Sequence, residues 1–175
     1  MSKSFEQIIE RSYHIAAELK HELVTLEHLL ASLLEDEWVK NLLKKAGGDP
    51  AAVGKANWRY LSDTSRWVIV KDASYMPRHT TLLSSVVKKA KTQSMFSGKQ
   101  EPGPIDIWLA MYGIPDSPAS YFIDKHGPSK DRIAEYLALE GSADNQMDER
   151  QALEILGTYC INLNNKAMSG RIDPL

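Results

Sequence analysis

Residues His21 to Asp36 read HELVTLEHLLASLLED, and this stretch decides the fold. Thr25 is placed to cap the start of a helix, and Glu27 adds a negative charge near the positive end of that helix. The leucines that follow fall at helical spacing and form one broad apolar face: Leu26, Leu29, Leu30, Leu33 and Leu34. A helix this short and this rich in leucine is predicted to be buried on most sides.

The same pattern occurs a second time in EPGPIDIWLAMYGIPD, from Glu101 to Asp116, at an offset of 79 residues (101 − 22). That offset aligns Glu27 with Asp106, and Thr25 with Pro104, a residue pre-set for the first helical turn. Residues 42–53 resemble 122–133 at an offset of 80, and an amphipathic run near each copy's start also matches: Phe5, Ile8, Ile9 and Ser12 with Leu83, Val86, Val87 and Ala90. Two copies predict an all-α, pseudo-two-fold domain of eight helices, with four helices in each copy.

The predicted domain covers residues 1–140, with copy one at 1–61, a crossover loop at 62–80 and copy two at 81–140. The second copy is predicted to form helices at about 81–95, 105–113, 118–126 and 130–139. The run from Trp67 to Val70 is interpreted as an apolar anchor of the loop, because one extended run makes no sheet. The large aromatic side chains are predicted to be core: Trp38, Trp58, Trp67, Trp108, Tyr121 and Phe122.

Composition narrows the class of protein. A net charge of −2 gives no electrostatic case for nucleic acid or for an anionic membrane. The one cysteine, Cys160, cannot form an internal disulfide and fits a reducing compartment. We find no signal-peptide pattern at the N-terminus and no run of 18 apolar residues, so the sequence predicts a cytoplasmic protein.

No reactive constellation stands out in the sequence. GDPAAVGKA, from Gly48 to Ala56, has five residues between its glycines and no hydroxyl after the lysine, so it is rejected as a phosphate loop. His14, His21 and His28 are seven residues apart, but a helix break near Lys20 separates them. A metal- or ligand-sensing domain built on these histidines stays open, as does an enzyme whose site is assembled across both copies.

The doubled pattern, with H-E-x-x-T-x-E-H-L-L from His21 to Leu30, resembles the N-terminal domain of the Clp unfoldase ATPases, most closely the ClpA branch. The resemblance covers residues 1 to about 140. The tail LGTYCINLNNKAMSGRIDPL is similar to the segment that leads into the first AAA+ module of that family. Residues 141–156 are predicted to be a flexible linker, because their first part, 141–151, is polar, acidic and rich in small side chains. On the resemblance residues 157–175 are the lead-in to a truncated module.

The resemblance implies a domain that binds partners and catalyses nothing itself. It implies protein substrates, a ClpS-like adaptor for N-degron proteins, and a parent hexamer docked on a ClpP-like protease. It implies no cofactor in this chain, with ATP and magnesium held only by the ATPase modules. The adaptor-facing positions of the family correspond to His21, Glu22, Glu27 and Thr80, and Thr81 also fits the last of them.

Overall fold

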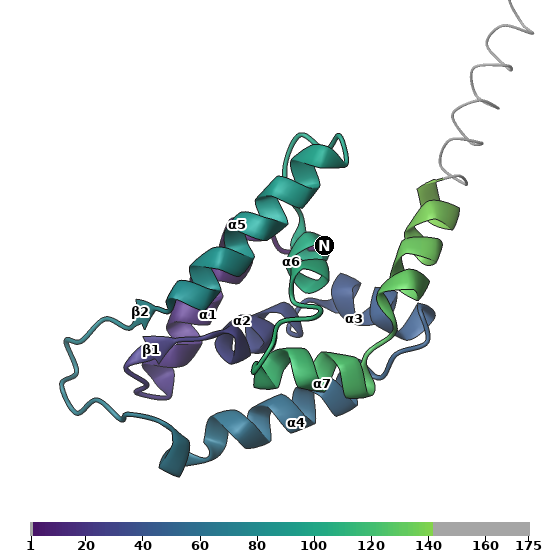
Figure 1. Ribbon diagram of the computed structural model, residues 1–175. Coiled ribbons are helices and arrows are strands. Elements are labelled where there is room, and N and C mark those ends of the chain that lie inside the picture. The colour runs from purple at the N-terminus through teal and green to yellow at the C-terminus, as the bar shows by residue number, and fades with distance from the viewer. Residues whose placement is uncertain (1, 142–175) are drawn as a thin grey trace, which may run out of the picture. The chain divides into compact units, whose positions relative to one another are not determined.

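The computed structural model describes residues 2–141. The element order is α1 (Phe5–Glu18), β1 (Leu23–Val24), α2 (Leu26–Leu33), α3 (Glu37–Lys45), α4 (Pro50–Ser62), the 3-10 helix η1 (Thr64–Arg66), β2 (Arg78–His79), α5 (Thr81–Phe96), α6 (Pro104–Ala110) and α7 (Pro118–His126). Residues 130–141 are also helical. The predicted all-α class is confirmed (Figure 1).

Helix α2 forms the centre of the compact unit that spans residues 2–133. All eight of its residues are buried, and it packs against α1, α4, α5, α6 and α7. The hydroxyl of Ser32 donates a 2.6 Å hydrogen bond to the carbonyl oxygen of Ile8, which joins α2 to α1 inside the core. The prediction that the leucine helix is buried on most sides is therefore confirmed.

The pairs α1–α2 and α5–α6 repeat one arrangement. Four of the five buried positions of α1 lie 78 residues (83 − 5) before buried positions of α5: Phe5, Ile8, Ser12 and Ala16 correspond to Leu83, Val86, Ala90 and Ser94. The residues preceding α2 and α6, Thr25 and Gly103, are also 78 apart (103 − 25). In both helices the side chain of the third helical residue accepts a hydrogen bond from the backbone N–H of the residue just before the helix. His28 accepts from Thr25 in this way, and Asp106 accepts from Gly103.

The offset of 79 is therefore wrong by one residue at this helix. It aligned Pro104 with Thr25, whereas Gly103 is the residue that matches Thr25; Pro104 occupies the first helical turn, as predicted, where a missing N–H costs nothing. Farther along, the offset of 80 is confirmed by two helix starts. Asp49 accepts from the N–H of Ala52, and Ser129 accepts from the N–H of Arg132.

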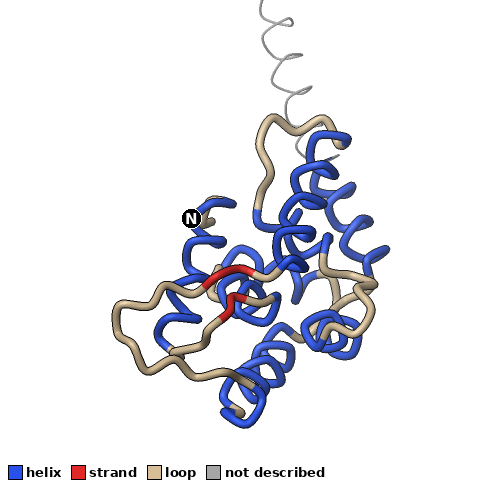
Figure 2. Tube along the Cα trace, turned by 60° about the vertical axis from the view of Figure 1, so that its left-hand side comes forward, coloured by secondary structure: helices blue, strands red, loops and turns tan. Residues whose placement is uncertain are grey.

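Residues 62–80 do more than cross between the copies, and the prediction that they form no sheet is wrong. The N–H of Glu22 donates to the carbonyl of Val68, and β1 pairs in parallel with β2, Leu23 opposite Arg78 (Figure 2). Each strand is too short to show alternation in the sequence. The predicted anchor is confirmed for Trp67, which packs against the buried cluster of Ile15, Ala31 and Leu61.

The aromatic side chains divide between core and surface. Trp108 is fully buried, as predicted from its place in the repeat. The prediction is wrong for Trp38 and Trp58, whose side chains are 39% and 40% exposed, and for Tyr121, which is 58% exposed. These three lie on the outer faces of α3, α4 and α7, because other residues occupy the helical positions that face the core.

Residues 134–141 belong to a second unit, in which the Tyr136 hydroxyl donates to the carboxylate of Glu140. The predicted linker at 141–156 and lead-in at 157–175 lie outside the described residues, apart from position 141, which is helical. Within residues 2–141 no helix is both long enough and apolar enough to cross a bilayer.

Candidate functional site

His21 follows α1 and is buried, with 2% of its surface exposed. Its ring stacks on Trp67 at a centroid distance of 4.2 Å, and its Nδ1 lies 2.8 Å from Nε2 of His28. Because Nδ1 of His28 accepts the N–H of Thr25, a neutral His28 carries its proton on Nε2 and donates it to His21. The two histidines thus form a fixed, directional hydrogen bond inside the molecule.

Both histidines are held in the neutral form. Burial lowers the pKa of His28 to about 3, and the neighbouring His21 adds to that effect. Burial also lowers the pKa of His21. His14 lies apart from this pair, on the exposed face of α1, with its Nε2 3.8 Å from the carboxylate of Glu10. In the part of the chain that the structure describes, no three His, Cys, Asp or Glu side chains gather as metal ligands.

Glu27 lies inside the molecule, with 5% of its surface exposed. Its Oε1 accepts a 3.3 Å hydrogen bond from the backbone N–H of Ala119 in the first turn of α7. Its own carbonyl oxygen accepts from the side-chain amide of Asn57 at 2.8 Å. A carboxylate at the start of a helix is favoured by the helix dipole, so Glu27 fastens α2 to α7 and α4.

Glu22 lies in the small sheet and is partly exposed. Its carbonyl oxygen accepts from the N–H of Arg78 and from the Tyr75 hydroxyl. Its carboxylate lies 3.7 Å from the guanidinium of Arg78, both groups being open to solvent. Such a pair is weak, so the carboxylate remains available to another donor.

Thr80 and Thr81 lie at the junction between β2 and α5. The hydroxyl of Thr80 accepts the N–H of Leu83 as the cap of α5, and its own N–H donates to Val24. Thr81, one residue on, is exposed. The structure therefore brings Glu22 and both threonines to the same small sheet, while His21 lies beneath it and Glu27 points toward α7.

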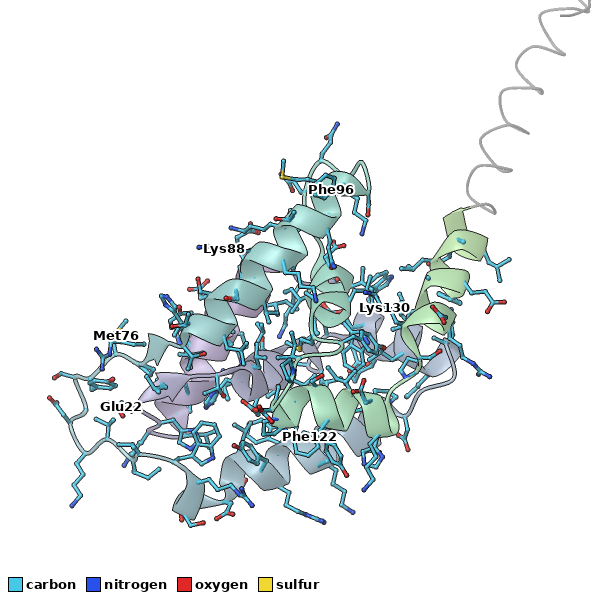
Figure 3. The ribbon with its side chains drawn as sticks, in the orientation of Figure 1. Glu22, Met76, Lys88, Phe96, Phe122 and Lys130 are labelled. Atoms are coloured by element: carbon cyan, nitrogen blue, oxygen red, sulfur yellow. The ribbon has the colours of Figure 1, made fainter. Side chains whose placement is uncertain are left out.

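Sequence reasoning missed a set of exposed apolar side chains on and beside this sheet. They are Leu23, Val68, Ile69, Met76 and Leu82, with exposed fractions from 37% to 79%. Figure 3 places Met76 and Glu22 at the same end of the molecule. The β-branched run after Trp67 was the available signal, but we interpreted it as anchoring the loop, which only Trp67 does.

The fold and this site define a duplicated, mainly helical domain with a small two-stranded sheet, extended by residues 68–69, on its surface. The sequence matches the Clp repeat (R) N-terminal domain family over residues 1–126. The chain belongs to this family, which confirms the resemblance drawn from the stretch at His21 to Leu30.

Relatives agree with this assignment. The chain is 26% identical to a ClpA homolog protein of Fuscovulum blasticum over 193 residues, which covers 99% of this chain and 24% of that protein. The chain thus spans about a quarter of that relative's length. Among solved structures, the Hsp104 N-terminal domain from Candida albicans has a TM-score of 0.66 at 19% identity, covering 81% of this chain and 92% of that one.

The N-terminal domain of the caseinolytic protease associated chaperone ClpD from Arabidopsis thaliana has a TM-score of 0.55 at 19% identity. That similarity covers 78% of this chain and 91% of the ClpD domain. At such identities the solved structures establish the fold.

Proposed function

We propose that this chain is the adaptor- and substrate-docking domain of a Clp-type, ATP-dependent unfoldase. It binds a ClpS-like adaptor and protein substrates, and a hexameric ATPase ring beyond this chain unfolds them into a ClpP-like protease in the cytoplasm. ATP and magnesium act in those ATPase modules. Membership of the Clp repeat family supports the proposal, as does the description of the ClpD relative as protease-associated.

The sheet face is the observation that carries the proposal. We define the sheet face as residues 20–24, 68–70 and 76–82. It exposes apolar side chains on three adjoining segments, with Met76 at 79% and Val68 at 64%. Exposed apolar side chains gathered within a polar rim are typical of surfaces that bind another protein.

The predicted site residues take two different parts in this proposal. Glu22 and Thr81 present a carboxylate and a hydroxyl at the surface, where an adaptor's donors can reach them. His21 and Glu27 are positioning residues, because each is buried and holds the backbone that carries the sheet face or α7. Thr80 acts through the cap of α5.

Calorimetric titration of the 175-residue chain with a purified ClpS adaptor tests the proposal. We expect Glu22→Lys to weaken adaptor binding by about tenfold. The substitution removes a hydrogen-bond acceptor and puts in its place a positive charge that repels any cationic group of the adaptor. Glu6→Lys is the matched control, because Glu6 is exposed in the first turn of α1 and outside the sheet face. Equal affinity of both variants and wild type would place the adaptor site elsewhere.

A further inference from the structure

A second concave surface lies between α4 and α7, which pack side by side at the opposite edge of α2 from α1 (Figure 1). It consists of two adjoining hollows of about 400 and 610 Å³. Four residues line both hollows and make them one groove: Tyr60, Arg66, Tyr121 and Phe122. Hollows of this size hold a few side chains of a bound peptide.

The wall of this groove is aromatic. The ring centroids of Tyr60 and Phe122 are 6.2 Å apart at an interplanar angle of 65°, and those of Tyr121 and Phe122 are 6.0 Å apart at 68°. Tyr121 leaves 58% of its surface exposed although its helix packs against the core. Edge-to-face rings hold one another in place, so an incoming apolar side chain would meet a rigid surface.

The first hollow is also rich in positive charge. Arg59, Arg66 and Lys125 line it, against one carboxylate, that of Asp63. Asp63 is already paired with Arg66 at 3.0 Å, and Arg66 lies over the ring of Tyr60. Among the described residues Arg59 and Lys125 enter no ion pair, so two cations remain unneutralised in a chain of net charge −2.

The second hollow has the opposite character. Asp116 and Asp124 line it, together with the apolar Ile114 and Pro118. A long polyanion would be repelled along this half, whereas a peptide can place carboxylates at one end and apolar side chains at the other. The charge pattern therefore favours a peptide over a nucleic acid.

We propose that the groove between α4 and α7 is a docking site for an acidic, aromatic-bearing peptide segment of a partner protein. Its carboxylates meet Arg59 and Lys125, and its apolar side chain lies on Tyr60, Tyr121 and Phe122. This site is separate from the sheet face and adds a second contact for a client or adaptor. Glu27 shapes it from below by holding the first turn of α7 at Ala119.

Fluorescence anisotropy of the 175-residue chain tests this site with a labelled peptide that carries Asp and Glu residues at one end and Phe and Leu residues at the other. Reversing both cations, Arg59→Glu with Lys125→Glu, is expected to weaken binding by about tenfold. The matched control is Lys88→Glu with Lys89→Glu, which changes the net charge equally on α5, away from Phe122 (Figure 3). The control is expected to stay within about twofold of wild type.

Removing the aromatic wall gives a second, charge-neutral readout. Tyr121→Ala is expected to weaken binding of the same peptide by about fivefold or more. Because the Tyr121 side chain is largely exposed, the substitution should leave the fold intact. The proposal is overturned if both charge reversals weaken binding equally, or if a peptide with serine in place of phenylalanine and leucine binds as well. It is also overturned if a single-stranded oligonucleotide of matched charge displaces the peptide at equal concentration, because the groove would then recognise negative charge alone.

Discussion

The carboxylate of Glu27 on α2 accepts the backbone N–H of Ala119 on α7, across 92 residues of sequence. Both residues are buried, so this single hydrogen bond joins the two copies within the core. A residue that the family resemblance assigns to partner contact thus also has a structural task. Loss of binding in a Glu27 variant would therefore not by itself locate a partner.

Glu27→Ala is expected to lower the free energy of unfolding by about 1–3 kcal/mol, because the Ala119 N–H would remain buried without an acceptor. Glu27→Gln keeps an amide oxygen in place and should lose less. Glu22→Ala, at the surface, should change stability by no more than about 0.5 kcal/mol. Urea denaturation of the three variants measures this order, and equal losses for Glu22 and Glu27 would contradict it.

Stability should fall as pH drops below about 6.5, the usual pKa of histidine. The unfolded chain takes up a proton on His28 there, whereas burial keeps the folded-state pKa of His28 at about 3. The unfolded state then binds more protons, so stability is full above pH 6.5 and is lost toward lower pH. For His28 alone the slope approaches about 1.4 kcal/mol per pH unit. Denaturation between pH 7 and 5 measures it.

The variant His28→Asn isolates this titration. An asparagine oxygen can take over the acceptor role of His28 Nδ1 toward the Thr25 N–H without titrating. The variant should show a shallower decline of stability between pH 7 and 5, even if its stability at pH 7 is lower. The same slope in both proteins would mean that other groups account for the pH dependence.

Gly48 lies in the connection between α3 and α4, and Pro128 of the second copy packs closely against it. A Cβ at this position would lie 2.2 Å from Cδ of Pro128 and 2.6 Å from its backbone nitrogen. Gly48→Ala should therefore cost about 1–3 kcal/mol or more, since the backbone must move. Thermal denaturation measures the loss.

Gly54 provides the opposite case for the same substitution. It lies inside α4, and an added Cβ would lie at an ordinary 3.7 Å from Cδ1 of Leu34. Gly54→Ala should raise stability by about 0.5–1 kcal/mol through helix propensity. If both alanines destabilise alike, the close approach at Pro128 is not the cause at Gly48.

Much of the scaffold could be predicted because its signals are local. The side chains of Ser4, Asp36 and Asp49 each accept a first-turn N–H, because a short polar side chain just before an apolar run can satisfy a free helix amide. The register of the repeat could not be fixed as well. Glu27 and Asp106 look equivalent as acids, but the acceptor that matches Asp106 is His28, a different residue type.

The candidate site was predictable only in part. Motif position says nothing about burial: Glu22 and Thr81 reach the surface, whereas His21 and Glu27 are buried. The backbone pairing of the sheet face involves only one or two residues in each segment, which no periodicity can reveal. The groove between α4 and α7 needs helices far apart in sequence, so it exists only in the folded chain.

The most direct test of the docking account is NMR chemical-shift mapping of the isotope-labelled 175-residue chain during titration with a ClpS adaptor. We expect the largest shifts at residues 20–24, 68–70 and 76–82, with Glu22 and Thr81 among them and with small shifts at the start of α1. Shifts confined to other surfaces, or none at saturating adaptor, would contradict the account.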